Sequence, residues 1–241
     1  EVKVEVCAEC HQGVATVEDL KNARMLGSLE DYDGDGNTTE GIYHEIQTIQ
    51  ESLYAGMRAY AKDVAASGIV YDPDAYPYYF ADVDGDGKID QADGKNINYK
   101  AWTPRLLKAA YNYQFSMKDP GAFVHNAKYI IELLCDSIDD LNAKLPTPVA
   151  GCGHRNDAGH FAGNTMPFRD WDEATATKPA FTVPGTCVKC HSSGGLAMFM
   201  ENGGTYVVTG TGSTVNTGTT MLPSASGFLC TTCHDGAKWP D

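Results

Sequence analysis

Hydrophobic residues recur every three or four positions along the middle of the chain, a period typical of helices with one buried face. The longest stripe predicts a helix from 38 to about 66, with Gly68 as its stop. Thr103 and the proline after it are a favoured helix start, so a second helix is expected to run to about 117. A third helix is expected from 126 to about 144, before two prolines.

The stretch 203–227 differs from the helical middle because it is rich in Gly, Thr and Ser and carries no charge. Tyr206 and the two valines after it favour a strand, so this stretch predicts a short β-hairpin near 205–220, with an inserted loop as the alternative. The expected fold class is mainly α with extensive loops. The expected parts are an N-terminal arm (1–30), a helical region (31–147) and a C-terminal region (148–241).

Composition narrows the range of partners. The chain has 241 residues and a formal net charge of −14, which argues against nucleic acid or an anionic membrane as a partner. No stretch approaches the ~20 apolar residues of a membrane-spanning helix. The sequence starts at Glu1 without a basic and apolar leader, so we expect a mature chain whose export signal has been removed. The expected location is extracellular or the cell surface, with the periplasm as second choice.

Three copies of the string C-x-x-C-H change the picture most, because this is the attachment site of a c-type haem. Two thiols three positions apart can bond both vinyl groups of one porphyrin, and the adjacent histidine ligates the iron. The prediction is three haem c groups with the chain wrapped around them; zinc binding or disulfide scaffolding is the alternative. The predicted thioether cysteines are Cys7, Cys10, Cys187, Cys190, Cys230 and Cys233, and the predicted proximal ligands are His11, His191 and His234.

Two cysteines, Cys135 and Cys152, remain outside these strings. Covalent haem attachment implies an oxidising compartment, which favours a disulfide between them over two buried thiols.

Four histidines remain as candidate distal iron ligands, which is one more than three bis-histidine haems need. The order of preference is His160, His125, His154 and His44. Methionine is the competing ligand type and would raise the reduction potential. The candidate methionines are Met25, Met57, Met166, Met198 and Met221.

Residues 82–93 match the twelve-residue loop of an EF-hand calcium site, with aspartates at positions 1, 3 and 5 and a turn glycine at position 6. An Asx-rich turn is the alternative, but so many like charges would repel one another unless neutralised. The predicted calcium ligands are Asp82, Asp84, Asp86, the carbonyl of Lys88, Asp90 and Asp93.

Residues 31–37 begin in the same way, but position 12 is Ile42, which cannot bind a metal. Glu40, or Glu45 in the following helix, would have to complete the shell. The chain is therefore expected to hold one or two calcium ions in a helical, EF-hand-like region. The predicted ligands of this first loop are Asp31, Asp33, Asp35, Asn37 and Glu40.

The chain resembles the multihaem c-type cytochromes of metal-reducing and related bacteria. The resemblance rests on the segments 104–114, 119–126, 159–161, 168–173, 183–186 and 227–228, the last two running into the second and third haem strings. It implies long-range electron transfer to extracellular acceptors and favours His125 and His160 as iron ligands. Some members of this group polymerise into conductive filaments.

The leading expectation is an electron carrier rather than an enzyme, serving redox proteins or extracellular acceptors. Haem strings near both chain ends favour a sharper hypothesis, in which copies associate head to tail into a filament. A multihaem oxidoreductase with one open haem site is the first alternative. A calcium-dependent docking or adhesion module is the second.

Overall fold

The computed structural model describes residues 2–8, 11, 13–24, 28, 30–157, 205–208, 213–216 and 233–236. The chain forms two compact units. One comprises Glu1–Leu20 with Ala158–Asp241, and the other is Lys21–Asp157.

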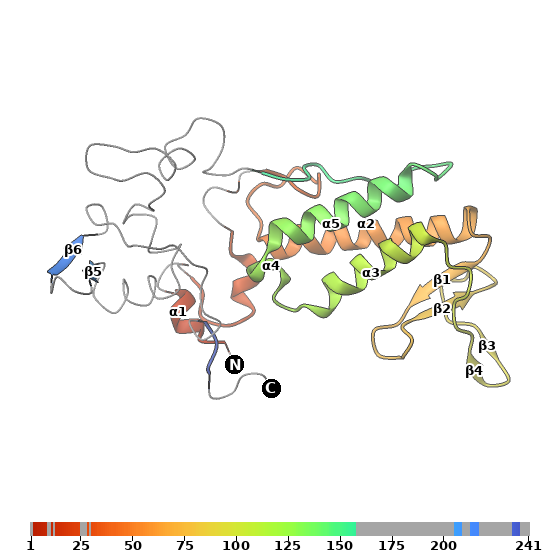
Figure 1. Ribbon diagram of the computed structural model, residues 1–241, viewed down its shortest axis with the longest axis horizontal. Helices are drawn as coiled ribbons and strands as arrows, with labels where there is room; N and C mark the ends of the chain where they lie inside the picture. Colours follow the sequence, from red (N-terminus) through yellow and green to blue (C-terminus); the bar gives the residue numbers. More distant parts are fainter. Residues whose placement is uncertain are drawn as a thin grey trace. The chain divides into compact units, whose positions relative to one another are not determined.

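Among the described residues of Lys21–Asp157, three long helices pack against one another (Figure 1): α2 (Ile42–Asp63), α3 (Pro104–Lys118) and α5 (Ala127–Asn142). The three helices predicted from hydrophobic period and from a capping pattern are confirmed, with ends shifted by a few residues. The predicted cap of the second is confirmed too, because the Thr103 hydroxyl accepts a hydrogen bond from the Leu106 amide at 3.2 Å. Their inward faces form one core that includes Leu53, Met57, Leu106, Ile131, Leu134, Ile138 and Leu141.

The short strands that lie between α2 and α3 in the sequence were not predicted. β1 (Gly68–Tyr71) pairs antiparallel with β2 (Tyr79–Asp82), and β3 (Gln91–Ala92) pairs with β4 (Lys95–Asn96). The prediction that Gly68 serves as a helix stop was wrong. The helix ends at Asp63, and Gly68 begins β1, where an added Cβ would overlap the Asp82 carbonyl oxygen.

Aromatic side chains join the β1–β2 pair to the helices. Tyr113 of α3 stacks on Tyr54 of α2 at 5.4 Å between ring centroids and meets Tyr71 of β1 edge-on at 5.2 Å. The Tyr79 hydroxyl donates to the Ala110 carbonyl of α3 at 2.7 Å. Burial raises the pKa of Tyr113 to about 12. The ring contacts and the Tyr79 hydrogen bond fix the two strands to the helical core through side chains.

A short helix, α4 (Ala122–His125), precedes α5. In the other unit, α1 (Val4–Ala8) lies near the chain start, and η1 (Asp19–Asn22) crosses from this unit into the next. β5 (Thr205–Val208) and β6 (Ser213–Asn216) form an antiparallel pair, which confirms the predicted hairpin. Among the described residues, no helix is long and apolar enough to cross a membrane.

The segment after α5 is fixed to that helix by a disulfide between Cys135 and Cys152, with an Sγ–Sγ distance of 1.99 Å. Arg155 adds a two-pronged ion pair to Asp136 of α5, with nitrogen–oxygen distances of 2.5 and 2.8 Å. This ion pair lowers the pKa of Asp136, because the guanidinium favours the charged carboxylate.

Removing the disulfide is expected to destabilise the protein by about 3 kcal/mol, because its sequence separation of 17 residues restricts the unfolded chain. The comparison is denaturant unfolding of the wild type and of the Cys135→Ala/Cys152→Ala variant. Equal free energies of unfolding would contradict the expectation.

The ion pair of Asp136 predicts a pH dependence. A lowered folded-state pKa stabilises the fold above the unfolded pKa of aspartate, and this contribution is lost as pH falls through the folded pKa. Arg155→Gln should therefore be slightly less stable than the wild type at neutral pH and equal to it in acid. Unfolding measured across that pH range checks this, and Asp136→Asn should behave in the same way.

Candidate haem and metal sites

Two of the three haem strings lie partly within the described residues. Cys7 is on α1, and the His11 amide donates to the Cys7 carbonyl at 2.9 Å, so the histidine follows one turn later. Cys233 and His234 belong to the third string, where burial raises the pKa of the Cys233 thiol. These thiols and imidazoles fit haem attachment by their chemistry. Predicted residues outside the described part are Cys10, Cys187, Cys190, Cys230 and His191.

Backbone contacts join the chain start to the third string. Val2 and His234 form an antiparallel bridge, and the Lys3 amide donates to the Cys233 carbonyl at 2.7 Å. Because Cys7 follows Lys3 by only four residues, the first and third strings lie close together. No pattern in the sequence predicted this pairing, since 226 positions separate Cys7 from Cys233.

Among the distal candidates that the structure describes, His125 has the surroundings that suit iron ligation best. Its Nδ1 lies 3.2 Å from both carboxylate oxygens of Asp119. Asp119 is itself held in place, since its Oδ1 accepts from the Gly121 amide at 2.9 Å. A carboxylate at Nδ1 orients an imidazole and favours the tautomer that binds a metal through Nε2.

The other described histidines are held differently. His44 contacts Asn22 through Nε2 at 3.1 Å, and His154 contacts Glu30 through Nε2 at 3.3 Å. Met57 is fully buried in the helical core, which suits packing rather than ligation. His160, Met25, Met166, Met198 and Met221 lie outside the described residues.

The two aspartate loops share one local geometry. In each, the first aspartate accepts from the amide of the glycine at position 6, at 2.8 Å in the loop at 31–37 and 3.1 Å in the loop at 82–88. Those glycines, Gly36 and Gly87, have φ of 93° and 82°. In each loop, position 3 also accepts from the amide of position 5, and position 5 from that of position 7. The repeated pattern turns the carboxylates of one loop toward one another.

In the loop that begins at Asp82, the structure brings together Asp82, Asp84 and Asp86, with one carboxylate oxygen of each within 4.8 Å of the others. Asp82 is only 4% exposed, and its Oδ1 has no hydrogen-bond partner. The Arg58 guanidinium lies 3.9 Å from its Oδ2. Lys88 Nζ pairs with Asp86 at 3.0 Å.

The other two predicted carboxylate ligands of this loop, Asp90 and Asp93, do not belong to this group of three. The Asp90 carboxylate accepts from the Val83 amide. Asp93 has φ of 53° in the turn between β3 and β4. A helical, EF-hand-like surrounding was expected, but strands flank this loop, because its buried first residue ends β2.

In the first loop, side chains from outside the 31–37 string complete the cluster. Asp31 and Asp33 group with Glu45, and Asp33 and Asp35 group with Glu40. Glu45 lies on α2 and is fully buried; its Oε1 pairs with Arg24 at 2.5 Å. Burial and neighbouring carboxylates raise the pKa of both Asp33 and Glu40, which is the expected effect of crowded like charges. No pattern in the sequence predicted that Arg24 would pair with Glu45 beside this loop.

The first loop also holds the segment that follows the disulfide. The Gly153 amide donates to the Tyr32 carbonyl at 2.9 Å, and the Tyr32 hydroxyl donates to Asp157 at 3.2 Å. Any ion bound by this loop would therefore stabilise residues 153–157.

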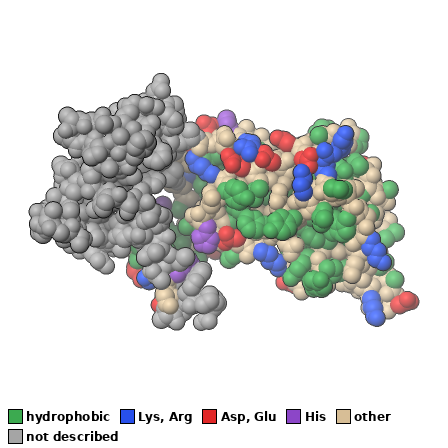
Figure 2. Space-filling model, viewed as in Figure 1, with side chains coloured by type: hydrophobic (Ala, Val, Ile, Leu, Met, Phe, Trp, Pro, Cys, Tyr) green, Lys and Arg blue, Asp and Glu red, His purple; other side chains and the backbone are tan. Residues whose placement is uncertain are grey.

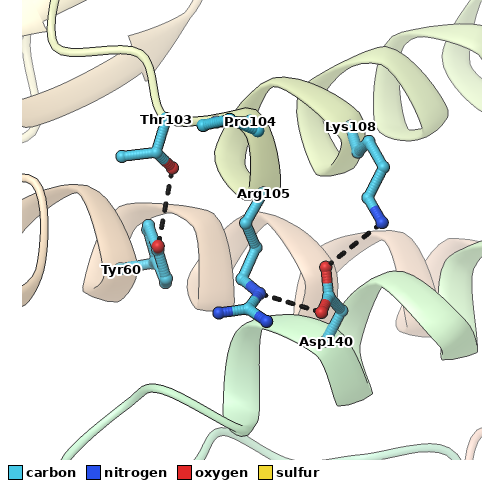
Figure 3. A pocket seen from close by; sticks show the side chains of 6 residues that line it. All are labelled: Tyr60, Thr103, Pro104, Arg105, Lys108 and Asp140. Atoms are coloured by element: carbon cyan, nitrogen blue, oxygen red, sulfur yellow. Dashed lines mark hydrogen bonds and ion pairs between the residues drawn. The ribbon is translucent and has the colours of Figure 1, made fainter.

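A surface cavity of about 500 Å³ lies between α3 and α5 and is lined by Tyr60, Thr103, Pro104, Arg105, Lys108 and Asp140 (Figure 3). Arg105 and Lys108 both point to Asp140, at 2.8 and 3.5 Å. Their charges are thus used in holding α3 to α5.

Hydrophobic side chains gather on the viewed face of the helical unit (Figure 2). Leu107, Tyr111 and Phe115 are exposed and recur every fourth residue along α3. Together they make an apolar stripe on the outside of the helix.

Strings of two thiols and an imidazole define the c-type cytochromes, and a segment of this chain is related to multihaem members of that class. The chain is 29% identical over 113 residues to the C-type polyheme cytochrome OmcC of Geobacter sulfurreducens, a match covering 42% of this chain. It is 30% identical over 105 residues, or 39% of the chain, to the C-type polyheme cytochrome OmcB of the same species. Each match spans 14% of the relative's length. No family model and no solved structure matches the chain.

Proposed function

We propose that the chain is a trihaem c-type cytochrome that carries electrons outside the cytoplasm. Each C-x-x-C-H string would hold one haem by two thioether bonds and one imidazole, and each bound haem would exchange single electrons at its iron. The carrying observation is the backbone contact between the chain start and Cys233–His234, which supports two haems close enough to share electrons.

The first test counts the haems. Intact-mass measurement of the purified protein should give the polypeptide plus three haem groups. Cys7→Ala/Cys10→Ala and Cys230→Ala/Cys233→Ala should each lose one haem. The matched control is Cys135→Ala/Cys152→Ala, which removes two cysteines but should keep all three haems. A wild-type mass equal to the bare polypeptide would refute the proposal.

A second test separates the carrier from an oxidoreductase with an open haem site. Voltammetry should show reversible one-electron waves, and the reduced protein should pass electrons to a soluble ferric chelate. Carbon monoxide should leave the spectrum of the reduced native protein unchanged, since every iron would have two axial ligands. Carbon monoxide binding without denaturation would favour the oxidoreductase.

We also propose His125 as one distal ligand, supported by its contact with Asp119. His125→Ala should convert one haem to a high-spin form in electron paramagnetic resonance. His44→Ala is the control of the same kind, because His44 contacts an amide side chain, Asn22, rather than an orienting carboxylate such as Asp119. His160 and His154 are the remaining proposed ligands.

An extracellular or cell-surface location follows from the same proposal. Head-to-tail self-association into a filament is its finer form, in which copies would join through a repeated contact that does not close into a ring. Electron microscopy of native material should then show fibres, and light scattering that shows only monomers would end the filament proposal.

One or two calcium ions complete the proposed cofactors. Both loops present crowded carboxylates, and hard oxygen ligands of this kind suit calcium. Calorimetric titration with calcium chloride, after chelation and desalting, should show saturable binding.

A further inference from the structure

The loop at 82–93 carries an observation that points to a bound cation. Asp82 is only 4% exposed, yet its Oδ1 has no hydrogen-bond partner. An unpaired carboxylate oxygen in the interior costs free energy unless a cation or a donor compensates it. Asp84 and Asp86 each place a carboxylate oxygen within 4.8 Å of a carboxylate oxygen of Asp82, and both of these side chains are exposed to solvent.

The nearby protein cations do not fill this place. Arg58 lies 3.9 Å from Asp82, but at Oδ2 rather than Oδ1, and its side chain is 44% exposed. Lys88 contacts Asp86 and is 82% exposed. Three carboxylates thus converge, and the buried one among them has an oxygen without a hydrogen-bond partner.

We infer that Asp82, Asp84 and Asp86 form a calcium site that does not use the carboxylates of Asp90 and Asp93. This inference rests on the proposed calcium binding and changes its ligand set. An EF-hand loop needs a carboxylate from position 12. Here position 12 is Asp93, which belongs to the β3–β4 turn and to no group of converging ligands among the described residues. Asp90 also lies outside this group of converging ligands, and its carboxylate accepts from the Val83 amide.

This ligand set predicts the affinity of the site. Without the position-12 carboxylate, water and backbone carbonyls must fill the remaining positions of the six to eight that calcium takes. The site should then bind with a dissociation constant of about 10⁻⁴ to 10⁻³ M, the range of extracellular calcium modules. It would be filled where calcium is millimolar and empty at cytosolic concentrations.

The test is calorimetric titration of the haem-loaded protein with calcium chloride. Asp84→Asn and Asp86→Asn alter exposed side chains and should each weaken binding at this loop about tenfold or more, since each removes a charged ligand. Asp93→Asn is the matched control: it removes the same charge from the same loop, and asparagine tolerates positive φ. It should change affinity by less than about twofold.

The outcomes separate the two proposals. A loss of binding in Asp93→Asn as large as in Asp84→Asn would overturn the three-aspartate site and restore position 12 as a ligand. Unchanged binding in Asp84→Asn and Asp86→Asn would overturn it as well. A wild type that binds no calcium would remove calcium binding altogether, while the haem count and voltammetry still decide electron transfer on their own.

Discussion

Replacing Arg24 with glutamine is expected to cost about 3–5 kcal/mol of stability, because it leaves a buried carboxylate without its counter-charge. Arg24 and Glu45 have side chains 9% and 0% exposed, and they meet at 2.5 Å. The guanidinium also donates to three backbone carbonyls, those of Ser28, Glu30 and Glu40. Removing it therefore affects the charge balance and the backbone around the first loop together.

The effect on the first loop should extend beyond the ion pair. Glu45 Oε2 accepts from the amides of Tyr32 and Asp33, at 2.9 and 3.0 Å. If Glu45 turns toward solvent in the variant, those amides lose their acceptor and the loop loosens. Calcium should then recover part of the lost stability, because an ion in the first loop would restore positive charge beside Glu45.

Denaturant unfolding followed by circular dichroism, with and without calcium, measures both effects. Arg58→Gln is the matched control. It also removes an arginine beside an aspartate loop, but that arginine is 44% exposed and 3.9 Å from its partner. Because the Arg58 guanidinium is half-exposed and not in hydrogen-bond contact with Asp82, it should contribute less than about 1 kcal/mol. A cost for Arg24→Gln no larger than for Arg58→Gln would mean that the buried pair does not hold the loop.

The three long helices and the β5–β6 hairpin were predictable from the sequence, whereas β1 and β2 were not, and the physical reason is burial. Along α2 and α5 one face is apolar and the other polar, so the helical period is visible in the sequence. β2 is buried at all four positions, so no alternation marks it as a strand. β1 has only four residues and depends on β2 for its hydrogen bonds.

The candidate sites were also only partly predictable from the sequence. Short motifs marked the C-x-x-C-H strings and the first five positions of each aspartate loop, because such motifs depend on local spacing. Contacts over long sequence distances were not visible: Arg24 with Glu45 is 21 residues apart, and Val2 with His234 joins the two ends of the chain. The carboxylate of Asp119 beside His125 depends on the turn before α4, which no periodic pattern predicts.

Leu134→Ala is expected to destabilise the protein by about 2–5 kcal/mol, through lost apolar burial and the cavity left behind. Leu134 lies on α5 and is 0% exposed, in the core shared with α2 and α3. Leu107→Ala is the matched control, because Leu107 is 53% exposed on α3. It removes the same atoms and should change stability by no more than about 0.5 kcal/mol. Denaturant unfolding of both variants gives the comparison.

The same pair of variants asks whether haem attachment depends on the helical unit. The predicted haem cysteines all lie in Glu1–Leu20 and Ala158–Asp241, and Leu134 lies in Lys21–Asp157. If each unit has its own core, Leu134→Ala should keep three haems by intact mass while its helical signal unfolds at lower denaturant. Loss of haem in this variant, but not in Leu107→Ala, would instead mean that the helical unit must fold before haem can be attached.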